Sequence, residues 1–333
     1  MDIVDSRRPQ DCLPPRQDAA GLLPIPAAMS SAREFEVAVI GGGPGGLAAA
    51  LWLGRYLHSV VLIDSGKPRN WETVAVNGYL GLPRVKPAAL RAAGRSECRR
   101  YGVELIDGCV NRATRTGIER FELDLENGSR YISRRVVLAM GLKDVWPDIP
   151  GLARCYGRSA HHCPDCDGYE TRGCQTVVVG QGRRAVALAL ALTTWTSDII
   201  ICTNGAPSDL EPELEEKLKA LNIPVIESRI RQAHSTRGRL RYLELEDGMP
   251  LNCEKLFFTV KSRPARELGM QLNCMRDEHG QIEVDHRQRT STEHVYAVGD
   301  VTPGPKLAIA AASQGTTAAA SIHRSLIPES RRL

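Results

Sequence analysis

The chain has 333 residues, more than one compact core of roughly 250 to 300 residues holds, so its length predicts two folded domains. Hydrophobic residues make up 42% and charged residues 25%, with 30 Gly and 20 Pro, which excludes collagen-like, coiled-coil and wholly disordered chains. The formal net charge is only +4 and the basic residues are scattered along the chain, so no feature supports nucleic-acid binding.

The first 33 residues differ from the rest of the chain. They carry five prolines and mixed charges, and two of these prolines interrupt the apolar piece at 19–29, which argues against a secretory signal. We interpret residues 1–33 as a disordered N-terminal tail. An alternative is that Met29 is the biological start, because Ser30–Glu34 leads directly into the first expected strand.

Cysteine usage and hydrophobicity together indicate the compartment. Ten cysteines in 333 residues are too few for a disulfide scaffold, and eight of them have no close partner in sequence. No apolar run approaches the roughly 18 residues that a membrane helix needs. The sequence therefore predicts a cytoplasmic protein without a membrane span.

The first folded segment has the pattern of a dinucleotide-binding turn. Phe35–Ile40 is expected as a strand, a Gly-Gly-Gly-Pro-Gly-Gly run follows, and Leu47–Tyr56 is expected as a helix. In G-x-G-x-x-G the first glycine allows the tight turn, the second lets the backbone approach a pyrophosphate, and the third lets helix and strand pack closely. These glycines are Gly41, Gly43 and Gly46.

A second strand strengthens this interpretation. Val60–Ile63 ends in Asp64, 18 residues beyond Gly46, where an acid that binds the ribose hydroxyls belongs. The alternative is a glycine turn with no ligand and an aspartate on the surface.

The only closely spaced cysteines are Cys163 and Cys166, in the run His-His-Cys-Pro-Asp-Cys-Asp. A C-x-x-C pair at a helix start brings two sulfurs within bonding reach and lowers the pKa of one thiol, which gives an exchangeable disulfide. A zinc site with His161 and His162 is the alternative. Because adjacent residues seldom converge on one tetrahedral ion and no second C-x-x-C exists, we expect no metal.

A second glycine turn follows the cysteines. Thr176–Val179 is expected as a strand, and the G-x-G-x-x-A sequence after it opens a helix, so a second dinucleotide could bind there. The next strand, Asp198–Cys202, runs into Thr203-Asn204-Gly205, which offers neither a cation for NADPH nor an acid for NADH. We therefore regard NADPH or NADH use as doubtful. The candidate residues for this nucleotide are Gly180, Gly182, Arg183 and Arg184.

Near the C-terminus, residues 291–300 form a short expected strand that runs into Gly-Asp and resemble the second FAD motif of the flavoprotein disulfide reductases. The resemblance implies that Asp300 bonds the ribityl chain of FAD and that the helix after Lys306 points its N-terminal amides at the flavin. Ala139-Met140-Gly141, after the expected strand Arg135–Leu138, stands where that family has Ala-Thr-Gly. These pieces come from opposite ends of the chain, so we expect a discontinuous FAD-binding domain, 34–143 and 261–333, with an inserted NAD(P)-type domain at 144–260 that carries the cysteine pair.

From about residue 34 onward the chain resembles the low-molecular-weight thioredoxin reductases, whose redox motif is C-x-x-C-D. The resemblance implies an α/β fold with two dinucleotide-binding (Rossmann-like, three-layer) domains, the second inserted in the first. It also implies that Cys166 lies against the flavin, that Cys163 exchanges with the substrate, and that Asp167 shuttles protons.

The same resemblance implies further FAD contacts, a homodimer, and a thioredoxin-like protein or small dithiol or disulfide as partner. Asn70 and Asn77 fall where these enzymes have a polar flavin-loop residue and an Asn before a turn. The other positions expected to line the FAD site are Pro44, Gly45, Ser65, Val110, Ala139, Gly141 and Ala308.

Several positions depart from the reductase pattern. The run Cys-Asp-Gly-Tyr-Glu together with Thr203-Asn204-Gly205 also resembles the dithiol oxidases that close disulfides in natural products such as gliotoxin and holomycin. The leading hypothesis is a reductase of disulfides, and the alternative is a dithiol oxidase that passes electrons to FAD and then to oxygen or another acceptor. A protein in which FAD is only structural is a third hypothesis, which requires the C-x-x-C-D match to be accidental.

Overall fold

The structure is a computed structural model that describes residues 33–331. The expected tail over residues 1–33, with the alternative start at Met29, lies outside the described residues except for Arg33. Arg33 is the first residue of strand β1 (Arg33–Ile40) and pairs with Tyr131, so the folded part begins one residue earlier than expected. Across 33–331, no helix has both the length and the apolar composition needed to cross a membrane.

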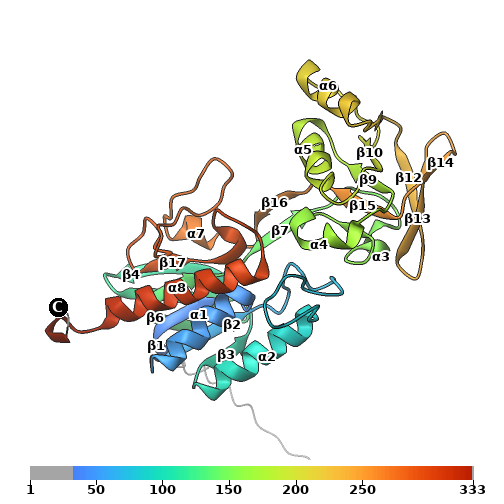
Figure 1. Cartoon of the computed structure of the whole chain (residues 1–333). Coiled ribbons are helices and arrows are strands. Elements are labelled where there is room, and N and C mark those ends of the chain that lie inside the picture. The colour runs from blue at the N-terminus through green and yellow to red at the C-terminus, as the bar shows by residue number, and fades with distance from the viewer. Residues whose placement is uncertain (1–32, 332–333) are drawn as a thin grey trace, which may run out of the picture. The chain divides into compact units, whose positions relative to one another are not determined.

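The first sheet has seven strands (Figure 1). Besides β1 they are β2 (Val60–Asp64), β3 (Glu104–Asp107), β4 (Val110–Gly117), β5 (Arg120–Leu125), β6 (Arg130–Leu138) and β17 (Val295–Ala297). The order is β3-β2-β1-β6-β5-β4, with β17 paired to the second half of β6. Strands β1, β2, β3, β6 and β17 are parallel, and β4, β5 and β6 form an antiparallel meander. The sheet therefore combines strands from both ends of the chain.

Alternating side chains of β1 supply both faces of this sheet. Val37 and Val39 pack with helices α1 (Pro44–Arg55), α2 (Pro87–Arg100) and α8 (Ala308–Leu326). Ala38 and Ile40 pack on the other face with the meander and with α7 (Leu268–Gln271). Burying each such aliphatic side chain stabilises the fold by about 1.5–3 kcal/mol, so the two clusters fix β1 and the turn after it.

Helix α1 begins at Pro44, three residues before the expected helix start. Proline is accepted at the first helical position because its missing N–H has no intrahelical partner there. Helix α8 crosses α1 closely, since a Cβ on Gly315 would lie only 2.1 Å from the carbonyl oxygen of Gly45. This close crossing brings the start of α8 to the glycine turn.

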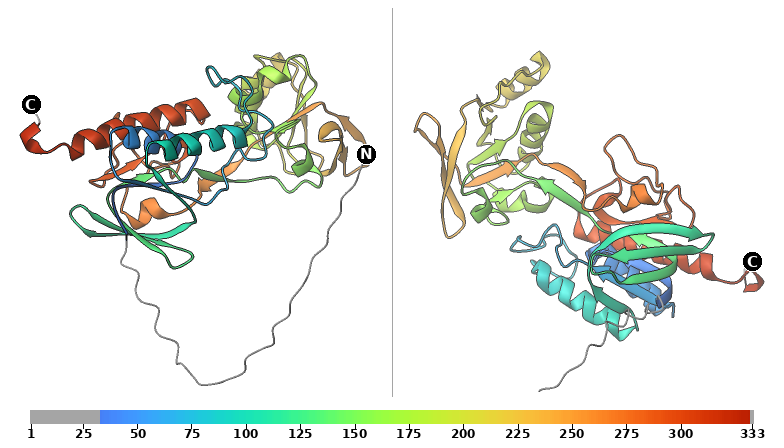
Figure 2. Two further views of the ribbon diagram at one scale, coloured as in Figure 1. Left: turned by 90° about the horizontal axis from the view of Figure 1, so that it is seen from below. Right: turned by 180° about the vertical axis from the view of Figure 1, so that it is seen from behind.

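The second sheet has five parallel strands in the order β11-β10-β9-β15-β8. They are β8 (Ala160–His161), β9 (Thr176–Val179), β10 (Ile199–Cys202), β11 (Val225–Ile226) and β15 (Lys255–Phe258). Helices α5 (Gly182–Leu192) and α6 (Pro212–Ala220) pack on one face. The other face carries α3 (Leu152–Cys155) and the antiparallel strands β12 (Ile230–Thr236), β13 (Arg239–Leu245) and β14 (Pro250–Asn252), as Figure 2 shows. The expected three-layer, Rossmann-like arrangement is confirmed for both sheets.

Two short strands connect the segments that build the two sheets. Strand β7 (Leu142–Val145) leads toward the second sheet, β16 (Lys261–Pro264) returns from it, and the two pair antiparallel with Asp144 opposite Ser262. The expected domain limits, 143/144 and 260/261, fall within or beside this ribbon. They stay a prediction, because pairing of β7 with β16 does not fix where one domain ends.

Candidate redox and cofactor site

The turn after β1 has the geometry that a bound dinucleotide needs. Gly41 has φ +112°, which favours glycine, and a Cβ there would lie 2.2 Å from the carbonyl oxygen of Ala139. Gly43 precedes α1, and no heavy atom lies within 4 Å of the place its Cβ would take, so the backbone there is accessible. A Cβ on Gly46 would lie 1.9 Å from the carbonyl oxygen of Gly41, so helix and turn pack in contact. The first amides of α1 lack intrahelical acceptors and are available to a phosphate.

A cleft of about 1490 Å³ starts at this turn and reaches the cysteine pair. It brings together most of the residues expected to bind the cofactor and the three expected catalytic residues. Those that line it are Gly41, Gly43, Pro44, Gly45, Asp64, Ser65, Asn70, Asn77, Val110, Ala139, Gly141, Cys163, Cys166, Asp167, Asp300 and Ala308. Gly46 does not line the cleft because it packs against the turn, and the residues expected to bind a second nucleotide lie elsewhere.

Asp64, the expected ribose acid, is buried at the end of β2 and lines the cleft. Arg91 of α2 donates to its Oδ2 through Nε at 3.1 Å and also through Nη2, while Arg95 lies 3.6 Å away. The backbone amide of Gly66 donates to its other oxygen at 3.2 Å. The carboxylate is therefore held in place, and sequence reasoning missed the two arginines because they come from a different element.

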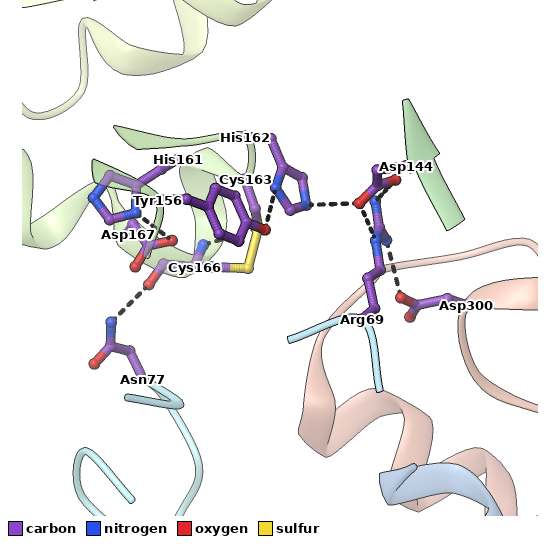
Figure 3. Close-up of a disulfide and its surroundings, with 10 residues drawn as sticks. All are labelled: Arg69, Asn77, Asp144, Tyr156, His161, His162, Cys163, Cys166, Asp167 and Asp300. Atoms are coloured by element: carbon purple, nitrogen blue, oxygen red, sulfur yellow. Dashed lines mark hydrogen bonds and ion pairs between the residues drawn. A yellow bond between two sulfur atoms is a disulfide. The ribbon is translucent and has the colours of Figure 1, made fainter. Parts of the chain in front are cut away.

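Cys163 and Cys166 form a disulfide at the start of α4 (Pro164–Asp167), with Cα atoms 5.3 Å apart (Figure 3). The backbone amide of Cys166 donates to Cys163 Sγ at 3.2 Å. Asn77, from the loop after β2, donates its side-chain amide to the carbonyl oxygen of Cys166 at 3.1 Å. This bond ties a residue of the expected FAD domain directly to the redox motif.

The two histidines before the disulfide have separate partners. His161 is buried and its Nδ1 lies 3.2 Å from Asp167 Oδ2, while His162 Nδ1 lies 3.0 Å from the Tyr156 hydroxyl. Burial lowers the pKa of His162, and the charge of Arg69 lowers it further. Among residues 33–331, no group of three or more His, Cys, Asp or Glu side chains is arranged to hold a metal ion. Both histidines therefore have polar partners close to the disulfide.

Arg69 is a residue of the cleft that sequence reasoning missed. Its guanidinium donates to both oxygens of Asp144, at 2.7 and 2.8 Å, and to Asp300 at 2.9 Å (Figure 3). The partners lie 75 and 231 residues away in sequence, so no local pattern indicates the contact. Burial opposes the charge of Arg69, but the two carboxylates outweigh it and the pKa of Arg69 is raised.

Residues 35–315 match the protein family described as pyridine nucleotide-disulphide oxidoreductase. The chain belongs to this family. Among its curated relatives, thioredoxin reductase tcpT of Claviceps purpurea is 31% identical over 283 residues, covering 82% of this chain and 88% of the relative. Thioredoxin reductase aclD of Aspergillus oryzae is 29% identical, covering 86% of this chain and 95% of the relative.

Two solved structures match most of this chain. HlmI is 36% identical with a TM-score of 0.84, covering 88% of this chain and 93% of HlmI. The putative thioredoxin reductase TrxB of Bacillus anthracis is 30% identical with a TM-score of 0.82, covering 88% of this chain and 98% of TrxB. The chain is therefore a thioredoxin-reductase-like flavoprotein oxidoreductase, as its motifs predicted.

The second glycine turn of this oxidoreductase differs from the first. A Cβ on Gly180 would lie 2.6 Å from Thr259 Oγ1, and Gly182 begins α5 with φ +56°. Arg183 pairs with Glu211, and Arg184 donates to the carbonyl oxygen of Val260 at 2.6 Å. Both expected phosphate ligands thus have partners within the protein.

The end of β10 also uses its polar groups internally. Asn204 Oδ1 accepts from the amide of Ile230 at 2.8 Å, and Thr203 donates to the carbonyl oxygen of Ala206. The Cβ of Arg229 lies 3.3 Å from the place of a Cβ on Gly205, so the side chain of Arg229 begins beside this loop. Sequence reasoning missed Arg229, which follows β11 and is exposed.

Seven other cysteines of the described chain are unpaired thiols. Burial raises the pKa of Cys98 to about 11 and that of Cys253 still further, so both stay protonated at neutral pH. Burial likewise raises the pKa of Cys109, which lines the cleft. Cys163 and Cys166 are the only cysteines of residues 33–331 that are joined in a disulfide.

Proposed function

We propose that this flavoprotein exchanges electron pairs between FAD and the Cys163–Cys166 disulfide, and between that disulfide and a partner's dithiol or disulfide. The partner is a thioredoxin-like protein or a small molecule. The observation that carries the proposal is the single cleft shared by the glycine turn, Asp300 and the cysteine pair. The bond from Asn77 to Cys166 supports it, because it links the two parts at the redox motif.

The fit to FAD rests on the shape of the cleft. The accessible backbone at Gly43 and the free amides of α1 suit a pyrophosphate, Asp64 suits a ribose, and Asp300 suits the ribityl chain. When bound, FAD supplies a two-electron acceptor or donor. The bond from Arg69 to Asp300 leaves the second carboxylate oxygen available to a hydroxyl group.

The cysteines and Asp167 carry the thiol chemistry. In the oxidising direction, a partner thiolate attacks Cys163 Sγ, the Cys163–Cys166 bond breaks, and a mixed disulfide forms. The partner's second thiol then attacks the partner sulfur that is bonded to Cys163, which releases Cys163. The partner leaves as a disulfide, and the protein holds the electron pair as a dithiol. Asp167 accepts the proton that the second thiol loses, and the same steps run backwards to reduce a disulfide.

Dithiol oxidation is a second candidate function, which the contacts at the expected NADPH site favour. At the expected NADPH site, Arg183 and Arg184 each have a partner within the protein, and Asn204 Oδ1 accepts from the amide of Ile230. A weak nicotinamide site removes the usual electron source of a reductase. We therefore propose a degraded NADPH site and leave the direction of electron flow to the test below.

Anaerobic stopped-flow absorbance tests the proposal. The oxidised enzyme is mixed separately with dithiothreitol, NADPH and NADH, and the loss of flavin absorbance is followed. Reduction by dithiothreitol that disappears in the double variant Cys163→Ser/Cys166→Ser supports the proposal, and the fastest physiological donor gives the direction. Equal reduction of parent and double variant would instead support a protein in which FAD is only structural.

We also propose a homodimer in the cytoplasm. The dimer rests on the family resemblance, and the compartment on the unpaired cysteines. Light scattering measures the mass: a value near 36.4 kDa indicates a monomer and twice that value a dimer. Cell fractionation with an antibody against the chain tests the compartment.

A further inference from the structure

A line of charged side chains runs from Asp300 to the neighbour of the redox disulfide. Arg69 bridges Asp300 and Asp144, and Asp144 Oδ2 lies 3.8 Å from His162 Nε2. His162 directly precedes Cys163. Arg69 thus connects the loop expected to hold the ribityl chain with the residue beside the exchanging sulfur (Figure 3).

The Arg69–Asp144 ion pair is mostly buried, and Arg69 donates to both carboxylate oxygens of Asp144. The Asp144 side chain is 5% exposed and that of Arg69 is 18% exposed, so water screens the pair only weakly. Asp144 also accepts from the hydroxyl of Ser262, which lies opposite it in the β7–β16 ribbon. The Arg69 and Ser262 donors fill both oxygens, and the pKa of Asp144 is lowered by them despite its burial.

We propose that Arg69 is a positioning residue of the redox centre: by fixing Asp144, which lies beside His162, it holds the segment before Cys163 in register with Asp300. The inference rests on the proposed function, because it assigns a role to that site's own residues. The proposed role requires an arginine at position 69, because a guanidinium holds one carboxylate with two parallel hydrogen bonds and still has a donor for a second carboxylate. A lysine carries the same charge but cannot make this fork.

Charged groups on the elements around His162 change the pKa of its ring. Asp144 and Asp167 favour the protonated ring, whereas burial, Arg69 and His161 disfavour it. The Tyr156 hydroxyl fixes Nδ1. Loss of Arg69 leaves the charge of Asp144 uncompensated and removes a charge that lowers the pKa of His162, so that pKa should rise.

The first measurement is the long-wavelength charge-transfer band between a Cys166 thiolate and the flavin in the Cys163→Ser variant. We expect Arg69→Gln in that background to weaken the band at least twofold or to shift it, with the absorbance measured per bound FAD. Arg69→Lys is expected to behave like Arg69→Gln, because the fork matters and the charge alone does not. Arg120→Gln, which removes an exposed ion pair with Glu34, is the matched control and should leave the band unchanged.

The second measurement is a double-mutant cycle on flavin reduction by dithiothreitol. Arg69→Gln and Asp144→Asn should each slow reduction about tenfold, and the double variant should be no slower than the slower single variant. If Arg69→Gln fails to fold, Ser262→Ala removes one donor to Asp144 and gives a smaller effect of the same kind. Variants within twofold of the parent in both rate and band, or strictly additive rates, would overturn the inference.

The two proposals fail in different ways. A parent enzyme whose flavin dithiothreitol cannot reduce would contradict the proposed function. The band requires only a thiolate beside the flavin, so it still decides the role of Arg69 in that case.

Discussion

His161 Nδ1 lies 3.2 Å from Asp167 Oδ2, and it is the only atom of the ring with a polar partner. The ring is 4% exposed, and its Nε2 has no hydrogen-bond partner. A buried polar atom without a partner is costly, so the contact through Nδ1 must hold the ring in this orientation. Asp167, the expected proton carrier, is thereby fixed beside Cys166.

This contact predicts different outcomes for two amide substitutions. His161→Asn places an amide N–H near the position of Nδ1, whereas His161→Gln places it near Nε2. We expect Asn to keep dithiol exchange within about threefold of the parent, and Gln to slow it about tenfold through the lost contact with Asp167. Rates of flavin reduction by dithiothreitol measure both, and equal rates for the two variants would contradict the role of Nδ1.

Single substitutions of the two cysteines should have different effects on the flavin absorbance. Cys163→Ser leaves the Cys166 thiolate beside oxidised flavin, so a long-wavelength absorbance band is expected. Cys166→Ser removes that thiolate together with the disulfide, and the flavin is then reduced only by an external donor and has no disulfide to which it can pass electrons. Absorbance spectra of both variants check this. A band in Cys166→Ser instead would mean that the roles of the sulfurs are reversed.

FAD should co-purify in about equimolar amount, and Asp64→Ala should reduce its retention. A charge-assisted hydrogen bond contributes roughly 1.5–3 kcal/mol, so FAD affinity should fall about ten- to a hundredfold. Asp107→Ala is a matched control, because Asp107 pairs with Arg95 and lies outside the cleft lining. Titration of apoprotein with FAD measures both variants. Colourless protein that takes up no FAD would contradict the cofactor assignment.

NADPH should be a poor reductant. Its 2′-phosphate needs a cation at the end of β10, and the loss of one such contact typically lowers affinity about ten- to a hundredfold. Under argon, over a range of NADPH concentrations, we expect flavin bleaching to take minutes or to be absent except at the highest concentrations. Complete bleaching within milliseconds would mean that arginines substitute, and the variants Arg183→Gln, Arg184→Gln and Arg229→Gln would then identify which of them binds the phosphate.

Glu119 should make the fold sensitive to acid. Its hydrogen bond from Arg135, whose side chain is 1% exposed, lowers the pKa of Glu119 to about 2. Because the pKa of Glu119 in the folded protein lies below the ordinary glutamate value of 4.5, the stabilisation is complete above that value and is lost as the pH falls from 4.5 toward 2. Thermal unfolding of Glu119→Gln and parent should therefore differ most at pH 7 and converge in acid. Glu122→Gln, on a more exposed ion pair with Arg130, is the control.

Local patterns predicted the elements that carry the chemistry. The first strand, the second strand with Asp64 and the strand Thr176–Val179 were all placed within about two residues, because alternating or continuous apolar runs bounded by glycine specify them. The strand before Ala139 was expected at Arg135 but starts at Arg130, since its first half pairs with β5 rather than continuing the apolar run. The family was predicted correctly because its motifs are themselves local.

Contacts between distant segments were not predictable in the same way. Arg69, Arg91 and Arg229 gain their meaning from partners that lie in other elements, and single charged residues in loops carry no periodic signal. The same holds for the histidine contacts, which depend on where β7 and β8 place Asp144 and His161. The sequence pattern identifies candidate site residues, but only the fold shows which distant residues contact them.

The pairing of β17 with β6 also orders events during synthesis. Val295 pairs with Val136, so the second half of β6 has no neighbour on that side until the ribosome has made the whole intervening segment. At about 5–20 residues per second this interval lasts roughly 10 to 30 seconds. Throughout it, the exposed edge of β6 can pair with other chains, and Asp300 does not yet exist to complete the cofactor cleft. The cleft that Asp300 lines is therefore completed only after most of the chain has been synthesised.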